Sequence, residues 1–176
     1  MLSKIIKLLF TVAIITIHTN GFTQKTNPSE TVKQQATTMV NAFLKKDYNT
    51  FSKMTNQTAI GKMGGATKMI EGLKQMDETF KQQGISFSKI TVGNPSNIIT
   101  VGNEMQCTIP QTTEMKMAMG RAIAKSTLIA VTNNGGKNWY FADAAGKDLK
   151  TLRTIMPNLS DKLVIPQKEQ PQFIPN

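Results

Sequence analysis

The spacing of apolar residues divides the chain at Gly84. Before this glycine, apolar side chains recur at intervals of three and four residues, the period of an amphipathic helix. The pattern predicts a first helix that is capped by Asn27, has Pro28 at its first position and runs to about Lys46. A short second helix is predicted to start at Asp47. A third helix, which Gly84 ends, is marked by five apolar positions: Met69, Ile70, Leu73, Met76 and Phe80.

Beyond Gly84 the pattern changes to short β-branched runs separated by turn residues, which is typical of antiparallel strands. We expect strands over residues 85–92 and 98–109, the second of them ended by Pro110. Residues 113–132 form a further β-prone stretch, in which Gly120 is expected to be a bend or bulge. The clearest hairpin has its turn at residues 133–136, Asn-Asn-Gly-Gly, and a returning strand over residues 138–142. A final helix is expected over residues 147–155.

Together these elements predict one α+β domain over residues 24–165. Its three N-terminal helices should pack on one face of a curved antiparallel sheet of four or five strands, with a helix at the C-terminal end. Residues 166–176 are rich in proline and glutamine. We expect them to form an extended tail, either mobile or laid along the sheet.

The N-terminal segment has the pattern of a secretory signal. Lys4 and Lys7 precede an apolar run at residues 8–17, and small residues at Gly21 and Thr23 suit cleavage before Gln24. A helix of ten residues reaches about 15 Å, half of a bilayer core of about 30 Å, so this run is too short for a permanent span. We therefore expect residues 1–23 to be a signal peptide and the rest to be exported, periplasmic or secreted, with no transmembrane segment.

The positions of the only histidine and the only cysteine restrict the chemistry. His18 lies inside the expected signal, and a mature chain without histidine lacks the base of Ser-His-Asp and Cys-His catalysis and the commonest zinc ligand. Cys107 alternates with Met105 and Ile109 along an expected strand, which predicts a buried, unreactive thiol. We expect no catalytic residues, no metal and no cofactor.

The charge of the chain permits an anionic partner but does not indicate nucleic acid. The formal net charge is +10, and removal of Lys4 and Lys7 leaves 19 basic and 11 acidic residues, a net charge of +8. The lysines are scattered, with no arginine cluster and no interleaved aromatic residues. A solvated basic surface is therefore the expected state of these side chains.

The order of elements resembles the cone-shaped nuclear transport factor 2-like fold, which is often grouped with cystatin-like folds. The resemblance covers most of residues 27–156. Residues 132–139, Thr-Asn-Asn-Gly-Gly-Lys-Asn-Trp, are similar to the Asp-box hairpin and to the Gly-Gly-Lys-x-Trp turn of small exported bacterial domains, with Asn134 where an aspartate is usual and Asn138 where a threonine is usual. Enzymes built on this cone place an acid/base with tyrosine or histidine in the pocket, whereas this chain offers only Asp47, Tyr48 and Tyr140.

Two classes of function stay open. The first is a non-catalytic binding or protein-interaction domain of the cell envelope, whose partner is an apolar or anionic small molecule or an envelope protein, with a dimer possible. Its expected binding residues are Phe80, Met105, Met117 and Trp139. The second is an isomerase-like or lyase-like enzyme with a small apolar pocket. The missing histidine favours the first class, whereas a pocket carboxylate of raised pKa would favour the second.

We predict that the chain is exported and cleaved near Gln24, because a charged start and a short apolar run precede a polar region. Mass spectrometry of the envelope and cytoplasmic fractions measures the N-terminus directly. An intact chain that retains Met1 in a cytoplasmic pool would contradict this prediction.

Overall fold

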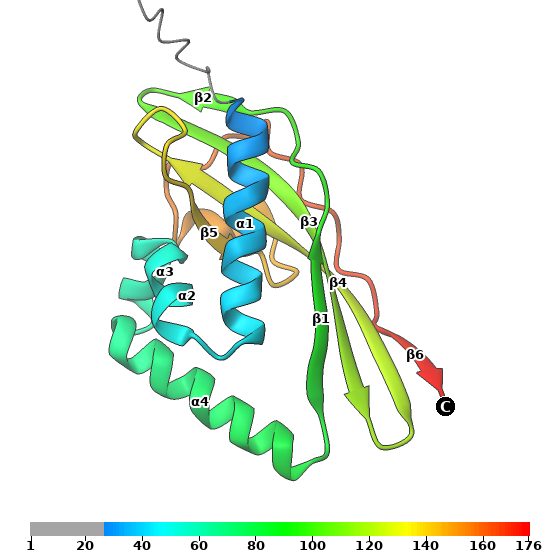
Figure 1. The fold of residues 1–176 in the computed structure, drawn as a ribbon. Helices are drawn as coiled ribbons and strands as arrows, with labels where there is room; N and C mark the ends of the chain where they lie inside the picture. Colours follow the sequence, from blue (N-terminus) through cyan, green and yellow to red (C-terminus); the bar gives the residue numbers. More distant parts are fainter. Residues whose placement is uncertain (1–26) are drawn as a thin grey trace, which may run out of the picture.

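The computed structural model describes residues 27–176, so the expected signal segment 1–23 and its cleavage before Gln24 lie outside the described residues. The fold is α+β: helices are followed by a curled antiparallel sheet in the form of a half-barrel and by a C-terminal strand (Figure 1). Within residues 27–176, no helix is long and apolar enough to cross a membrane.

Four helices precede the sheet, one more than the sequence predicts. They are α1 (Pro28–Leu44), α2 (Tyr48–Met54), α3 (Gln57–Lys62) and α4 (Ala66–Gln82). The side chain of Asn27 caps α1, and that of Asp47 caps α2 by accepting the Thr50 N–H at 3.0 Å.

Helix α3 is the helix that the apolar pattern of the sequence does not indicate. It spans six residues and buries only Ile60, which is too little to produce a helical period. Its one local signal is Asn56, whose Oδ1 accepts the N–H groups of Thr58 and Ala59, each at 3.1 Å. An N-cap without an apolar stripe does not distinguish a short helix from a turn.

All the strands that the structure names pair antiparallel in one six-stranded sheet, where four or five strands were expected. The order is β1-β3-β4-β5, while β2 also pairs with β3 and β6 also pairs with β4. The strands are β1 (Ser86–Val92), β2 (Ile99–Val101), β3 (Glu104–Met117), β4 (Gly120–Thr132), β5 (Tyr140–Asp143) and β6 (Gln172–Pro175).

The strand expected over residues 98–109 is divided, and Pro110 does not end it. A turn containing Gly102, whose φ is +57°, separates β2 from β3. Pro110 stays within β3 because its carbonyl accepts the Gly93 N–H at 2.8 Å. The N–H and C=O of one residue point to the same side of an antiparallel strand, so the missing N–H of Pro110 faces the end of β1 and not β4.

The C-terminal part also differs from the expectation. The helix predicted over residues 147–155 is the five-residue α5 (Leu149–Arg153), and it does not close the fold, since the chain continues to β6. Strand β6 pairs with Gly120–Ile123 of β4. A Cβ atom at Gly120 would lie 2.2 Å from the carbonyl oxygen of Ile174, so the glycine lets the tail approach β4 closely.

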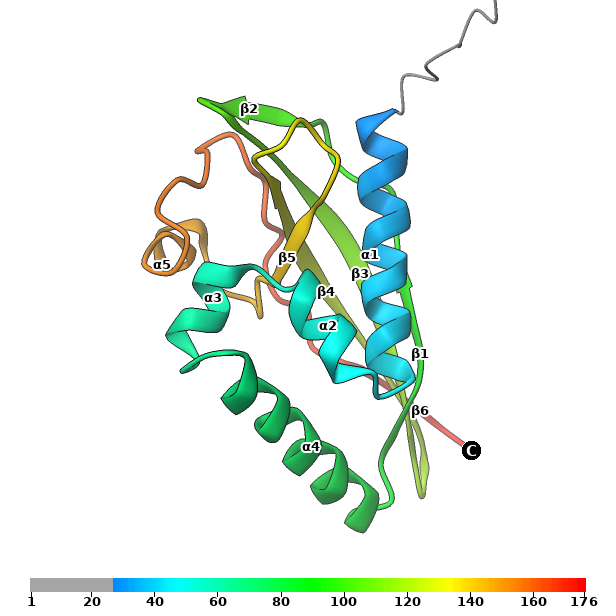
Figure 2. The same ribbon diagram turned by 60° about the vertical axis from the view of Figure 1, so that its left-hand side comes forward.

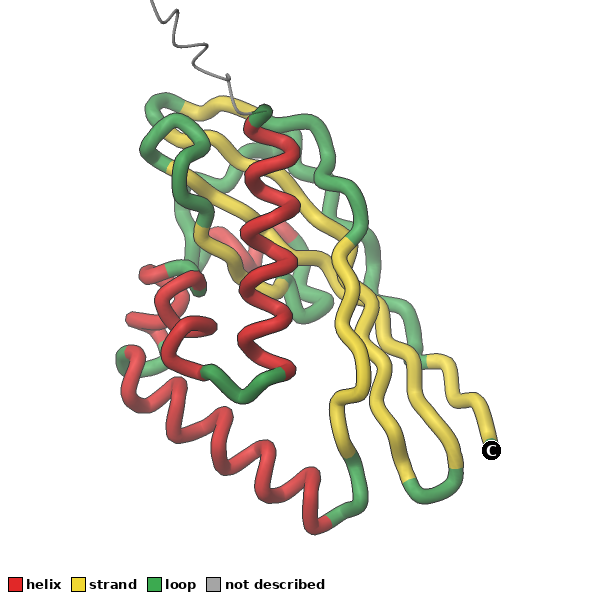
Figure 3. Tube along the Cα trace, in the orientation of Figure 1, coloured by secondary structure: helices red, strands yellow, loops and turns green. Residues whose placement is uncertain are grey.

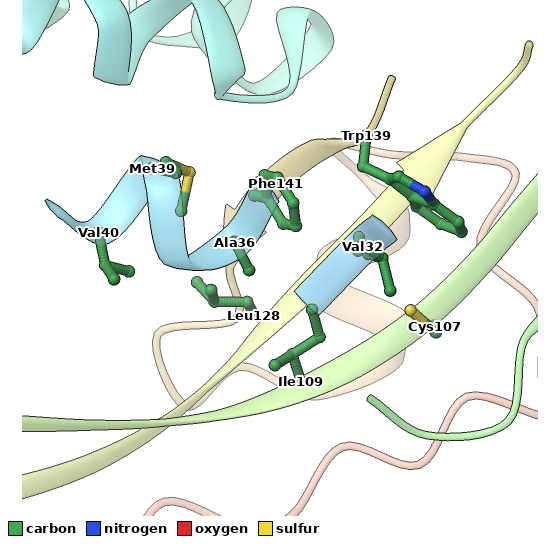
Figure 4. Close-up of a cluster of buried hydrophobic side chains, with 10 residues drawn as sticks. Val32, Ala36, Met39, Val40, Cys107, Ile109, Leu128, Trp139 and Phe141 are labelled. Atoms are coloured by element: carbon green, nitrogen blue, oxygen red, sulfur yellow. The ribbon is translucent and has the colours of Figure 1, made fainter. Parts of the chain in front are cut away.

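Two clusters of buried side chains cover opposite faces of the sheet. In the first, side chains of α1 face side chains of β3, β4 and β5, as Figure 4 shows. In the second, residues after β5 cover the other face. The first cluster contains Val32, Ala36, Met39, Val40, Cys107, Ile109, Leu128, Ala130, Trp139 and Phe141. The second contains Ile129, Val131, Ala144, Leu152, Met156, Leu159 and Leu163.

Gln35 joins α1 to the β4–β5 hairpin through both ends of its amide. Its Oε1 accepts the Trp139 N–H and its Nε2 donates to the Lys137 carbonyl, both at 2.7 Å. Within the turn, the side-chain Oδ1 of Asn134 accepts the Asn138 N–H at 3.0 Å. The predicted hairpin is confirmed, but its returning strand is β5 at residues 140–143 and not 138–142, and Gln35 holds the hairpin on α1.

We predict that Gln35→Ala lowers the free energy of unfolding by about 1 to 3 kcal/mol, because it leaves the Trp139 N–H without its acceptor. Urea denaturation monitored by tryptophan fluorescence measures this change. Gln34→Ala is the matched control, since Gln34 is exposed on the same helix, and it should change stability by less than about 0.5 kcal/mol. Equal effects of the two variants would contradict the role of Gln35.

Candidate binding cavity

A cavity of about 640 Å³ lies between the helices and the concave face of the sheet. Residues of α1, α2, α3 and α4 form its helical wall, and residues of β1, β3, β4 and β5 form its sheet wall. The main apolar side chains of the helical wall are Met39, Phe43, Phe51, Ala59, Met69 and Leu73. Those of the sheet wall are Phe87, Ile90, Leu128 and Phe141, and the α5 segment, by which we mean residues 149–156, adds Leu152, Ile155 and Met156.

The cavity exists because α1 covers only part of the concave face. Figure 3 shows β1, β3 and β4 continuing past the C-terminal end of α1. Helix α4 lies across from this uncovered part and stands away from the sheet (Figure 2). Met69 is the only buried residue of α4, and its other apolar positions, Ile70, Leu73, Met76 and Phe80, are only partly buried.

Contacts near both ends hold α4 in this position. Gly64 and Gly65, with φ of +88° and +98°, form the turn into the helix, a conformation that favours glycine. Near the C-terminal end, the Phe80 ring packs on Phe87 with centroids 5.6 Å apart. Lys46 Nζ lies 2.6 Å from Asp77 Oδ2, an exposed ion pair that adds little energy but links α4 to the loop after α1.

Charged side chains line the cavity only where it meets solvent. Of its lining residues, three are charged, Lys62, Asp143 and Lys147, and all three are exposed. We call this group the mouth of the cavity. Asp143 is held as an acceptor, because Ser126 Oγ donates to its Oδ2 at 3.0 Å and the Ala145 N–H donates to its Oδ1 at 2.6 Å.

The four residues expected to bind a ligand lie outside the lining of this cavity. Trp139 is 1% exposed in the first cluster, and its Nε1 donates to the Gly136 carbonyl at 3.1 Å. Met105 packs at the edge of that cluster. Phe80 contacts Phe87, and Met117 is half-buried at the end of β3 next to the turn into β4.

The residues considered for an enzyme have structural roles. Asp47 is exposed, and hydrogen bonds from Thr50 to its carboxylate hold its pKa below the usual value. Tyr48 is 6% exposed, burial raises the pKa of its hydroxyl, and its ring packs edge-on against Phe43 with centroids 6.1 Å apart. These two residues and Tyr140 are not part of the cavity lining.

Sequence reasoning identified part of the helical wall but not the mouth. The third predicted helix carried Met69 and Leu73 on its apolar stripe, and both line the cavity. Lys62 and Lys147 had no distinguishing signal, because they belong to a scattered set of lysines. Lys62 and Lys147 line the same cavity only because the fold places α3 close to the residues after β5.

Cys107 is fully buried, and burial raises the pKa of its thiol to about 12. The thiolate is the reactive form, so a thiol of this kind is inert at neutral pH. Among the described residues, no group of three or more histidine, cysteine, aspartate and glutamate side chains could hold a metal ion.

We predict that Cys107 in the folded protein is not alkylated by iodoacetamide up to about pH 9, because its thiol stays protonated and covered. In urea the same thiol should react, since its pKa returns to about 8.5. Intact-mass spectrometry counts the adducts, and Cys107→Ala is the control for labelling at other side chains. Labelling of the folded protein at the rate seen in urea would contradict the buried state.

The search for similar proteins matched no protein-family model and no curated protein.

Proposed function

We propose that the described domain is a non-catalytic binding module whose cavity holds a small apolar or partly apolar molecule. The observation that carries the proposal is the position of α4, whose Met69 and Leu73 border a cavity of about 640 Å³ and belong to neither cluster of buried side chains. Sites for small molecules typically have volumes of about 300 to 1,000 Å³ and apolar walls with a few polar groups.

Burial of apolar surface supplies the binding energy. Each methylene group that leaves water for such a site contributes about 0.8 kcal/mol before the cost of association. Methionine side chains on the walls, Met39, Met69 and Met156, adapt to different ligand shapes because the thioether chain is unbranched and flexible. The cavity is therefore suited to shape-tolerant binding of an apolar group.

The chemistry of the lining favours binding over catalysis. General acid/base catalysis requires a titratable group within hydrogen-bonding distance of the reacting atoms. The one carboxylate in the lining is Asp143, which is exposed and accepts two hydrogen bonds from the protein. An isomerase-like or lyase-like reaction has no such support among the lining residues.

The proposal has two further parts, which concern the fold family and the location of the protein. The helix-then-sheet order and the curled half-barrel support a nuclear transport factor 2-like cone. The basic and apolar pattern of residues 1–23 supports export to the periplasm or beyond. Under this proposal the domain binds its ligand outside the cytoplasm.

Leu73→Trp tests the binding function, because the indole ring would occupy space that a ligand needs. With Nile red as a neutral apolar probe, we predict fluorescence enhancement by the unmodified protein and an at least tenfold weaker dissociation constant for the variant. Lys74→Trp adds the same ring at the neighbouring exposed position and is the matched control. It should bind like the unmodified protein.

Circular dichroism and urea denaturation establish that both tryptophan variants are folded. Equal binding by Leu73→Trp and the unmodified protein, or no binding by any of the three, would contradict the proposed function.

A further inference from the structure

We propose that the ligand is a monomeric single-chain anionic amphiphile, whose apolar chain enters the cavity and whose carboxylate or phosphate head lies between Lys62 and Lys147. This inference rests on the proposed binding function and specifies its ligand class. It follows from the contrast between an apolar interior and a mouth with two cations.

The two lysines come from distant parts of the chain. Lys62 is in the last turn of α3, and Lys147 is in the loop between β5 and α5. The N–H of Asn56, which caps α3, donates to the Phe141 carbonyl of β5 at 2.8 Å. This bond fixes α3 beside β5, with the α5 segment close by (Figure 2), so that both lysines line the same cavity.

The ammonium groups of the mouth are not neutralised by ion pairs within the described residues. The basic residues that form salt bridges within residues 27–176 are Lys46, Arg121, Lys125 and Arg153, and none of these lines the cavity. Asp143 also lines the cavity, but Ser126 and Ala145 already donate to its two oxygens. The mouth therefore carries two positive charges against one negative charge, which complements an anionic head group.

Apolar side chains line the same cavity as these charges. Met63, the residue after Lys62, is 58% exposed and lines the cavity, and Ile155 and Met156, which follow α5, line it too. A ligand with a charged head and no chain would leave this surface in water, and an uncharged chain would leave the lysines unpaired. An anionic amphiphile satisfies both parts of the site.

Three probes with the same twelve-carbon chain separate the head from the chain: laurate, 1-dodecanol and dodecyltrimethylammonium. Isothermal titration calorimetry on the protein as isolated, below the aggregation concentration of each probe, gives the dissociation constants. We expect laurate to bind most tightly and the cation most weakly. The Lys62→Gln/Lys147→Gln double variant should weaken laurate binding by about 3- to 30-fold and leave 1-dodecanol unchanged.

The matched control is Lys74→Gln/Lys81→Gln, which removes the same charge from exposed positions of α4 outside the lining. It should leave laurate binding unchanged. If laurate and 1-dodecanol bind equally, or if both double variants weaken laurate equally, the head-group assignment is wrong although the cavity still binds an apolar chain. If none of the three probes binds and Leu73→Trp does not weaken the binding of Nile red, the binding function itself is wrong.

Two other results would overturn the proposal. Binding to phosphatidylglycerol vesicles without binding of monomeric laurate would assign the lysines to a membrane surface. A dimer in light scattering that Leu73→Asp converts to monomers, together with no laurate binding, would show that a second copy of the chain covers the cavity.

Discussion

The packing of α1 on the concave face of the sheet is the interaction on which the rest of the structure depends. Val32 and Ala36 have no exposed surface, and they pack in one cluster with Ile109 of β3, Phe141 of β5 and Trp139, which precedes β5. Small and β-branched side chains on the helix allow close approach to the sheet. Gln35 adds polar contacts that hold the β4–β5 hairpin against the same helix.

The length of α1 determines where the cavity lies. The helix ends at Leu44, and Lys46, with φ of +59°, reverses the chain before the remaining helices. The helices that follow therefore lie opposite the part of the sheet that α1 leaves uncovered (Figure 1). Phe80 and Asp77 hold α4 near its C-terminal end, whereas the space beside Met69 and Leu73 stays unfilled by the protein.

The opposite face of the sheet is covered by residues after β5, among them Leu152, Leu159 and Leu163. Gln106 is fully buried, and its amide bonds to the backbone of Asn158 and Ser160, each at 2.9 Å. A satisfied polar group of this kind fixes the segment after α5 on the sheet. The same segment contributes Met156 both to the second cluster and to the lining of the cavity.

The sequence by itself determined the features that depend on near neighbours: the caps at Asn27 and Asp47, the stripe of α4, the change of period at Gly84 and the hairpin turn at residues 133–136. Only the tertiary structure decided which apolar side chains meet each other and which border a space. Trp139 and Leu73 are both apolar positions in a periodic pattern, yet one is in a core and the other lines the cavity. Periodicity shows which face of an element avoids water, whereas the partner of that face depends on contacts between residues far apart in the chain.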